Sequence, residues 1–286
     1  MSSDVYVGKD LGNLELTITA DMIEHYMRGL DEPNPWYTND SPFGGPVAPV
    51  IVFQNISSRF KGWYLDNLFG NLWMRQEWRV YAPTRLGQTL QCSARVADRY
   101  RKRDRDVVAL EVMVRDATGN LVACGVQHQS FLVEQTSGDV TLRDPAAKEG
   151  AKKHPEPTGE ALSLELKKAF TEEMCAIYFF ASRNYHNDKE ESKKLGFDDV
   201  VVGGRMTLSC ITELLTRHFG RGFYLGGHLD VKFTNVLWPN EPFTVRGVIT
   251  DRHPDHGHTR ANVAVFAEKA DGTKIIVGTA SALENA

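Results

Sequence analysis

The feature that most constrains this chain is that its second half repeats the pattern of its first. The segment Thr19–Met22, with Tyr26 after it, recurs 152 positions later as Thr171–Met174, with Tyr178 after it. An ordered series of such pairs predicts an internal duplication, so the chain should fold as two copies of one unit. Four further pairs follow at shifts of 153 to 159 positions: Gly44-Gly45 and Gly203-Gly204, Ala82-Pro83 and Trp238-Pro239, Gly119 and Gly272, and Gly125 and Gly278.

A polar stretch separates the two copies. Residues 136–162 contain three prolines, three glycines and several lysines, and they sustain no apolar period. Such a composition is typical of a linker. We therefore expect an N-terminal unit at residues 1–135 and a C-terminal unit at residues 163–286, each large enough to bury a core of its own.

Each copy has the same order of elements. Thr19 and Thr171 suit the N-caps of short helices, because acidic residues follow in the first turn and apolar residues come after them. A polar loop with glycines follows, then a longer apolar helix, then three or four β-rich runs. This order predicts an α+β unit whose long helix packs on an antiparallel sheet. The expected helices cover residues 19–30, 49–60, 171–181 and 206–219, and the expected strands cover 73–81, 89–97, 107–115, 121–133, 228–237, 243–250, 261–267 and 274–282.

Charge and hydropathy exclude several classes of protein. The chain has 33 basic and 37 acidic residues, so it lacks a sequence-wide basic field for nucleic acid. No apolar run approaches the roughly 20 residues that span a bilayer, and the N-terminus has no signal-peptide pattern. We therefore expect a cytoplasmic protein without a nucleic-acid or membrane partner. Four widely spaced cysteines without a CxxC pair predict buried thiols rather than a disulfide frame or a zinc site.

Both copies also carry a motif that resembles a known family. The second half contains Asn184-Tyr185-His186-Asn187-Asp188, then Gly196-Phe197, then an apolar run ending in Gly203-Gly204. This pattern is similar to the MaoC-type (R)-specific enoyl-CoA hydratases and dehydratases, whose motif is Asp-x-Asn-Pro-x-His-x-Asp, then Gly-Phe, then an apolar stretch ending in His-Gly. The first half carries a weaker copy, Glu32-Pro33-Asn34-Pro35-Trp36-Tyr37 followed by Pro42-Phe43-Gly44-Gly45.

The resemblance implies a fold and an activity. The fold would be a double hotdog, in which each of two units wraps an antiparallel sheet round a long helix. The activity would be the reversible hydration or dehydration of an acyl thioester, carried by coenzyme A or an acyl carrier protein. Neither a metal nor a redox cofactor is implied. The partner would be this small-molecule substrate, and a homodimer of such chains is plausible.

The resemblance also implies roles for particular residues. His186 would be the general acid/base, because a histidine near its working pH suits proton transfer. The amide of Gly204, at the start of a buried helix, would stabilise the enolate oxygen, and Asn184 would hold the loop. Four further residues are expected around the substrate: Gly203, Asp188, Tyr37 and Glu32.

The sequence departs from the family motif at the acid. The family places an acidic residue five positions before the histidine, where this chain has Ala181, or Ser182 if one residue is deleted. Glu32 and Asp188 are the candidate substitutes, and we expect weak turnover of crotonyl-CoA. The departure keeps two alternatives open. One is a cyclase or isomerase that uses the same cavity for a bulky substrate, and the other is a non-catalytic ligand-binding or partner subunit.

Two charged clusters lie between expected strands. The stretch 251–258 combines aspartate and histidine in a metal-like composition, but Pro254 and Gly257 favour a solvated hairpin. The arginine-rich stretch 99–105 also predicts a hairpin tip. The alternative for this second cluster is a contact to the phosphates of coenzyme A, which arginine geometry suits.

Overall fold

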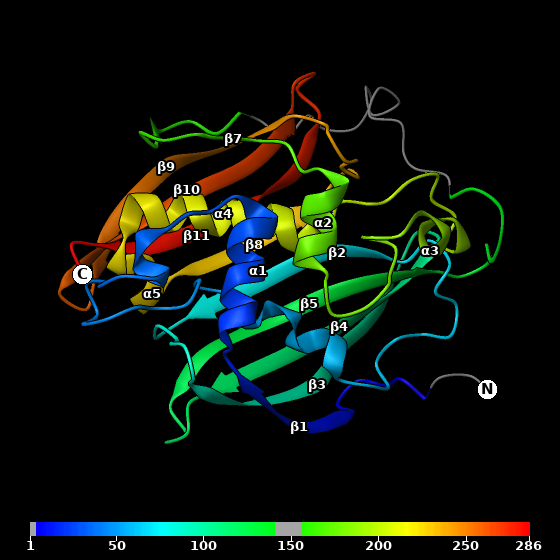
Figure 1. The fold of residues 1–286 in the computed structure, drawn as a ribbon, viewed down its shortest axis with the longest axis horizontal. Helices are drawn as coiled ribbons and strands as arrows, with labels where there is room; N and C mark the ends of the chain where they lie inside the picture. The colour runs from blue at the N-terminus through cyan, green and yellow to red at the C-terminus, as the bar shows by residue number, and fades with distance from the viewer. Residues whose placement is uncertain (1–3, 141–155) are drawn as a thin grey trace.

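A single curved sheet forms the framework of the protein (Figure 1). The computed structural model describes residues 4–140 and 156–286, and within them eleven strands pair antiparallel. The order along the sheet is β1-β3-β4-β5-β2-β8-β11-β10-β9-β6, and β7 also pairs with β9. The strands are β1 (Asp10–Thr17), β2 (Leu72–Val80), β3 (Thr89–Lys102), β4 (Arg105–Arg115), β5 (Leu121–Leu132), β6 (Glu160–Ala161), β7 (Leu166–Lys168), β8 (His228–Phe233), β9 (Phe243–Asp255), β10 (His258–Lys269) and β11 (Lys274–Glu284).

The two halves join at the middle of this sheet. Strand β2 of the first half pairs with β8 of the second, with Gln76 opposite Val231 and Trp78 opposite Leu229. Outward from this pair the order is the same on both sides, namely β5, β4, β3 and β11, β10, β9. The arrangement is the double hotdog that the duplication and the family resemblance predicted.

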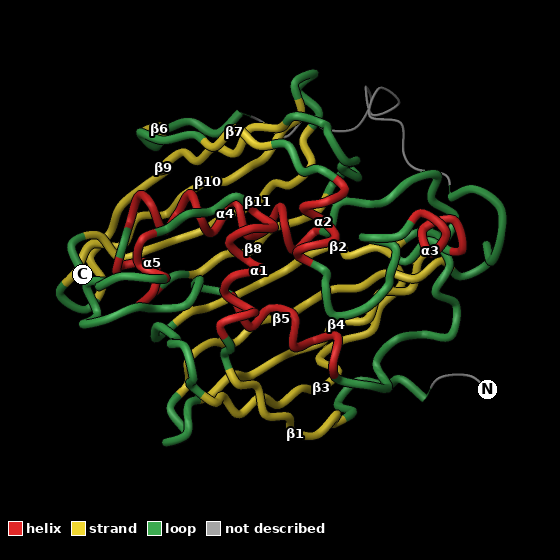
Figure 2. The backbone as a smooth tube through the Cα atoms, viewed as in Figure 1, coloured by secondary structure: helices red, strands yellow, loops and turns green. Residues whose placement is uncertain are grey.

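The helices cover one face of the sheet (Figure 2). Helices α1 and α2 pack against each other, and α4 lies on the sheet of the second half. Thr19 and Thr171 are N-caps, as expected, and each side chain accepts a hydrogen bond from the third backbone N–H after it. The helices are α1 (Ala20–Leu30), α2 (Glu172–Tyr178), α3 (Lys189–Lys194), α4 (Gly204–Phe219) and α5 (Arg221–Gly226), with 3-10 helices η1 (Pro35–Tyr37) and η2 (Val52–Arg59).

The first half departs from the expected order at its second helix. Residues 49–60 were expected to form a long helix, but they form the 3-10 helix η2. Three β-branched residues, Val50 to Val52, precede Asn55 and a pair of serines, and these residue types are weak helix formers. In the described part of the chain, therefore, only the second half has a long central α-helix.

Other differences are local. Strand β1 at one edge of the sheet was not expected, and α3 lies within a stretch expected to be loop. Strand β6 lies inside the expected linker 136–162, of which residues 141–155 are outside the described part of the chain.

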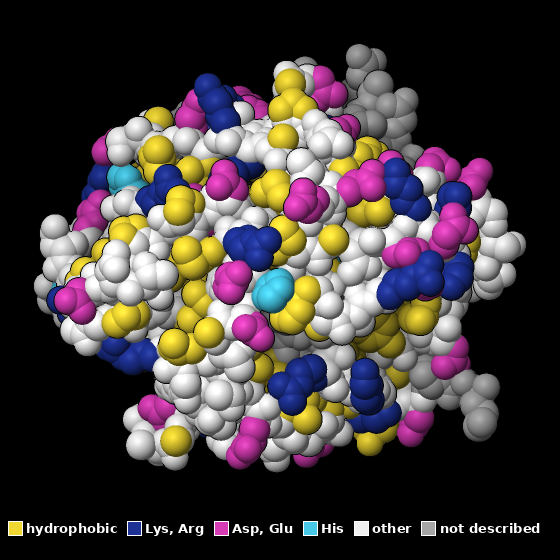
Figure 3. All heavy atoms as spheres, in the orientation of Figure 1, with side chains coloured by type: hydrophobic (Ala, Val, Ile, Leu, Met, Phe, Trp, Pro, Cys, Tyr) yellow, Lys and Arg dark blue, Asp and Glu magenta, His cyan; other side chains and the backbone are white. Residues whose placement is uncertain are grey.

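Both charged clusters lie in hairpins, as expected. Residues 99–105 form the β3–β4 hairpin, where Arg99 and Arg101 both pair with Asp106. Residues 251–258 belong to the β9–β10 hairpin, where Asp255 pairs with Arg260. Figure 3 shows basic and acidic side chains interspersed over the helical face. Within the described residues, no helix has both the length and the apolar composition needed to cross a membrane.

A duplicated glycine lies beside each central strand. A Cβ atom on Gly125 would lie 2.5 Å from the carbonyl oxygen of Glu77 in β2, and a Cβ atom on Gly278 would lie 2.1 Å from that of Asp230 in β8. Both distances are far shorter than van der Waals contact. The second copy therefore repeats a steric requirement of the first at the seam between the halves.

Gly278→Ala should therefore destabilise the protein. The added methyl group has to displace the backbone of β8, and overpacking of this kind costs about 1–3 kcal/mol. The free energy of unfolding from urea titration measures the effect. Thr279→Ala, at the exposed neighbouring position, is the matched control and should cost less. A Gly278→Ala variant as stable as the wild type would contradict the close approach at the seam.

Candidate active site

A loop between α2 and α3 carries His186, and its own asparagines hold it in place. The side-chain oxygen of Asn184 accepts a hydrogen bond from the backbone N–H of His186 at 2.9 Å. The side-chain amide of Asn187 donates to the carbonyl oxygens of Phe179 and Ser182, at 2.8 and 2.9 Å. The backbone at His186 is thus fixed by short-range bonds within the loop.

The imidazole of His186 is held in one tautomer. Its Nδ1 lies 2.7 Å from the carbonyl oxygen of Val201. A carbonyl oxygen can only accept, so the ring proton is on Nδ1 and the lone pair is on Nε2. The ring stacks on Phe179, with 4.4 Å between centroids, and lies 3.9 Å from the ring of Tyr185.

Burial of the ring keeps His186 neutral. Desolvation, with a smaller contribution from the positive charge of Arg205, lowers its pKa from 6.5 to about 4, although the hydrogen bond to Val201 acts in the opposite direction. At neutral pH the ring is therefore an uncharged base with Nε2 available to accept a proton.

The N-terminus of α4 lies against the same aromatic group. Gly203 is the N-cap and Gly204 the first helical residue, and no side chain caps the first turn. A Cβ atom on Gly203 would lie 2.3 Å from the ring of Phe179, and one on Gly204 would lie 3.0 Å from Trp73. A side chain on Gly203 would therefore displace the ring of Phe179, and one on Gly204 would pack tightly against Trp73. The first amides of a helix, with its dipole, form a site that stabilises negative charge.

The ring of Phe179 lies between the His186 loop and the N-terminus of α4. Its ring contacts His186 on the one hand and Gly203 on the other, and Val201, the acceptor for His186, lies two residues before Gly203. The structure thus brings together four of the residues singled out in the sequence. We call this group, His186 with Asn184, Gly203 and Gly204, the His186 site.

The first half supplies other walls of the His186 site. Arg205, next to Gly204, places its guanidinium 3.4 Å from the hydroxyl of Ser57 and 6.0 Å from the ring centre of Trp73. Gln54 of η2 donates to the hydroxyl groups of Tyr178 and Ser209 at 2.8 and 2.9 Å. The site is therefore composite, and η2 and β2 of one half complete the helix start of the other.

Asp188 serves the loop rather than the ring. Its carboxylate forms two hydrogen bonds with Arg183, at 2.6 and 3.0 Å, and accepts one from the backbone N–H of Glu191 as the N-cap of α3. The contact with Arg183 lowers the pKa of Asp188 to about 2. Asp188 is therefore ionised at neutral pH and carries no proton to donate.

Glu32 and Tyr37 lie elsewhere, in a second buried group. The hydroxyl of Tyr37 donates a short hydrogen bond to Glu32, whose other carboxylate oxygen is buried without a hydrogen-bond partner among the described residues. Their neighbour Glu213, on α4, pairs with Lys168 at 3.2 Å. Glu213 lies nine positions beyond Gly204, which is about 13 Å along the helix. The structure thus separates Glu32 and Tyr37 from His186, although the sequence suggested one shared substrate site.

Burial makes Glu32 a weak acid. Desolvation and the nearby Glu213 raise its pKa from 4.5 to about 8, while the hydrogen bond from Tyr37 acts in the opposite direction. Glu32 is therefore largely protonated at neutral pH, and a neutral carboxyl group is far cheaper to bury than a carboxylate.

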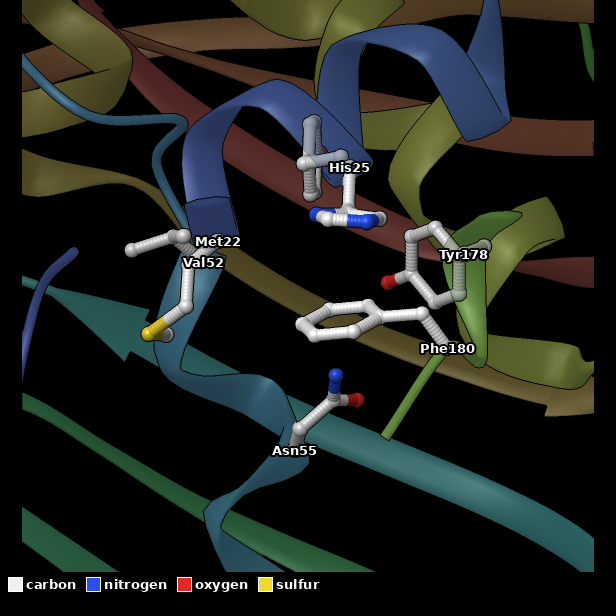
Figure 4. A pocket seen from close by; sticks show the side chains of 7 residues that line it. Met22, His25, Val52, Asn55, Tyr178 and Phe180 are labelled. Carbon is white, nitrogen blue, oxygen red and sulfur yellow. The ribbon is translucent and has the colours of Figure 1, made fainter. Parts of the chain in front are cut away.

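A small pocket opens near the His186 site without including it (Figure 4). It lies between α1, α2 and η2, and the stacked rings of His25 and Phe180, 3.7 Å apart, form one side. Its volume of about 30 Å3 has room for one or two water molecules and not for an acyl thioester. Its lining residues are Met22, His25, Tyr26, Val52, Asn55, Tyr178 and Phe180.

The sequence reading missed three contributors to the His186 site. Phe179 ends α2 and reads as part of an apolar helix face, and Gln54 stands in a stretch read as an apolar helix. Arg205 could have been identified from the sequence, because it directly follows the Gly203-Gly204 motif. An arginine at that position is ordinarily interpreted as an exposed residue of a helix start.

The acidity of Glu32 predicts how stability depends on pH. Its folded-state pKa lies above the unfolded value, so the folded state binds more protons between pH 4.5 and about 8. The stabilisation is complete below pH 4.5 and is lost as the pH rises through 8. Against Glu32→Gln, the wild type should lose stability on the order of a few kcal/mol between pH 6 and 9.

Chemical denaturation at several pH values measures this difference. Glu24→Gln, on the exposed face of α1, is the control and should track the wild type. If the stability difference between wild type and Glu32→Gln does not change with pH, Glu32 is not the buried neutral acid described above.

One half of the sequence matches a known family model, and the whole fold matches solved structures. Residues 5–124 match the family model described as the FAS1-like dehydratase domain region. A search of curated protein sequences found no match. The matched stretch runs from the N-terminal segment into β5 and lies within the first unit.

Solved structures agree over the whole chain. A MaoC-like dehydratase is 14% identical, with a TM-score of 0.76 and 98% of both chains covered. A MaoC-like dehydratase from Phytophthora capsici is 17% identical, with a TM-score of 0.71 and 97% of both chains covered. A double hotdog protein from Mycobacterium tuberculosis is 14% identical, with a TM-score of 0.62, covering 97% of this chain and 96% of the other. The double hotdog fold and the resemblance to the MaoC type, both predicted from the motifs, are thereby confirmed.

Proposed function

We propose that this double hotdog chain, which resembles the MaoC-type hydratases and dehydratases, adds water reversibly to an α,β-unsaturated acyl thioester. The observation that carries the proposal is the neutral His186, with Nε2 unprotonated, beside the uncapped start of α4. A base and an anion-stabilising amide are the two groups that this chemistry needs most. The histidine position of the motif is His186 in the second half and Tyr37 in the first, so we propose one active site per chain.

The reaction follows from these groups. His186 Nε2 takes a proton from water while the water oxygen bonds to the β-carbon of the substrate. Negative charge moves to the thioester oxygen, where the N–H of Gly204 stabilises it. The imidazolium then gives its proton to the α-carbon, which restores neutral His186 and completes the addition of one water molecule. The low pKa of His186 makes the imidazolium a strong acid for this last step.

Among the residues that the structure describes, no second acid supports His186 within this site. Ala181 and Ser182 are exposed, Asp188 is ionised and bound to Arg183, and Glu32 belongs to the group near Glu213. One positioned acid or base contributes about 10²–10⁴ in rate. We therefore propose slow turnover of crotonyl-CoA and faster turnover of a substrate that binds with additional contacts.

A second candidate function has a specific observation in its favour. An isomerase or cyclase needs one proton-transfer group and an oxyanion donor but no activated water. The neutral His186 can transfer a proton, whereas the ionised Asp188 has none to donate. Rearrangement of an unsaturated thioester without uptake of water would favour this candidate. A protein that only binds a ligand is the third possibility, and it would bind thioesters without turning them over.

Replacement of His186 tests the proposal. His186→Ala should lower kcat for hydration of an enoyl-CoA panel, from crotonyl to branched and aromatic esters, by at least about 100-fold. Tyr37→Phe, in the buried group near Glu213, is the control and should cost much less activity. Equal losses in the two variants, with both folded, would place the chemistry outside the His186 site.

The pH dependence of catalysis gives an independent test. Because the neutral imidazole is the base and its pKa lies near 4 rather than 6.5, kcat/KM should stay level as the pH falls from 7 to about 5. An acid limb centred near pH 6.5 would show that His186 is not desolvated in the working enzyme, or that another group is the base.

A further inference from the structure

Arg205 is a half-buried cation, and it has no acidic partner in the part of the chain that the structure describes. It follows Gly204 in the first turn of α4, and its guanidinium has five N–H donors. The hydrogen bond that the structure gives to this group is the one to Ser57, at a long 3.4 Å. Among residues 4–140 and 156–286, no carboxylate lies within ion-pair distance of it. A partly desolvated cation that lacks a counter-ion is costly to keep.

The surroundings of Arg205 are aromatic and hydroxyl-bearing. Its positive charge acts on the phenol groups of Tyr64, Tyr178 and Tyr185 and on the imidazole of His186. The indole of Trp73 lies on another side. Guanidinium and phenol groups are donors, and a low-polarity wall strengthens each bond that they form. A small anion beside the guanidinium would therefore form strong hydrogen bonds.

The position of Arg205 limits which anion can reach it. Gly204, directly before it, is the residue whose amide meets the thioester oxygen under the proposed function. The guanidinium therefore reaches atoms of the acyl group close to the reacting carbons. The phosphates of a coenzyme A or acyl-carrier thioester lie at the far end of the pantetheine arm, many bonds from the thioester, so the anion belongs to the acyl group itself.

We propose that Arg205 binds a carboxylate on the acyl group, so that this protein prefers thioesters of unsaturated dicarboxylic acids. The inference rests on the proposed function for the orientation of the thioester. A planar guanidinium holds a carboxylate through two parallel hydrogen bonds. A neutral acyl group leaves the cation unpaired, and this difference is what selects the substrate.

Binding of unreactive analogues tests the proposal without requiring turnover. Succinyl-CoA and butyryl-CoA have acyl chains of the same length and differ in the terminal carboxylate. Calorimetry should give a Kd for succinyl-CoA that is about ten- to a hundredfold lower, because a hydrogen bond to a charged group adds that much. Among enoyl substrates, kcat/KM should favour an ester with a distal carboxylate over crotonyl-CoA by a similar factor.

Arg205→Gln should abolish both preferences. Arg221→Gln is the matched control, since Arg221 also begins a helix and lies over an aromatic ring, 5.5 Å from the centre of Phe43. This control should keep both preferences. Arg205→Lys, which keeps the charge without the planar fork, should keep them in part, and it covers the case in which Arg205→Gln does not fold.

Three outcomes would overturn the proposal. The first is equal binding of succinyl-CoA and butyryl-CoA by the wild type. The second is a preference that survives in folded Arg205→Gln. The third is an Arg205→Gln variant that weakens all coenzyme A esters equally but leaves the phosphate-free pantetheine esters unchanged, because Arg205 would then bind a carrier phosphate. Tighter binding of succinyl-CoA without any hydration would support the carboxylate site while rejecting the proposed hydratase activity.

Discussion

The antiparallel pairing of β2 with β8 is the constraint on which the rest of the molecule depends. It turns two half-sheets into one, and it brings the first half against the helix start of the second. Across this seam, Nε of Arg75 donates a hydrogen bond to the carboxylate of Asp230 at 2.7 Å, and the ring centres of Trp73 and Phe233 lie 4.7 Å apart. Because Trp73 also touches Gly204, the strand pairing itself places a wall of the His186 site. A hotdog unit on its own would lack that wall.

The two copies have diverged around a single long helix. The first half has η2 where the second has α4, so both halves share one central helix instead of contributing one each. The neutral His186 lies near the start of α4, and Glu213, the neighbour of the protonated Glu32, lies about 13 Å further along the helix. Each buried group is neutral at pH 7 for the same reason, because desolvation disfavours its charged form. Each copy thus has a buried titratable group, which is the acid Glu32 in the first half and the base His186 in the second.

The local features were the ones that sequence reading predicted well. Thr19 and Thr171 mark helix starts through a side-chain bond to a near neighbour, and such bonds depend on a few consecutive residues. The duplicated glycines Gly125 and Gly278 lie beside the paired strands β2 and β8, but the sequence did not indicate that these two strands pair. The α-helix expected at residues 49–60 did not form, because an apolar pattern does not distinguish an α-helix from a 3-10 helix and the β-branched run Val50 to Val52 is a weak helix former.

The sequence by itself determined the duplicated architecture, the double hotdog fold and the loop that carries His186, since these follow from repeats and motifs along the chain. Tertiary structure alone decided which groups act together. Glu32 precedes Tyr37 by five residues and bonds to it, yet the two are grouped with Glu213 and not with His186, while Ser57 and Arg205 meet across 148 positions. Burial also set the acidity of His186 and Glu32 in opposite directions. Desolvation depends on every element that surrounds a group, and no local segment of sequence records it.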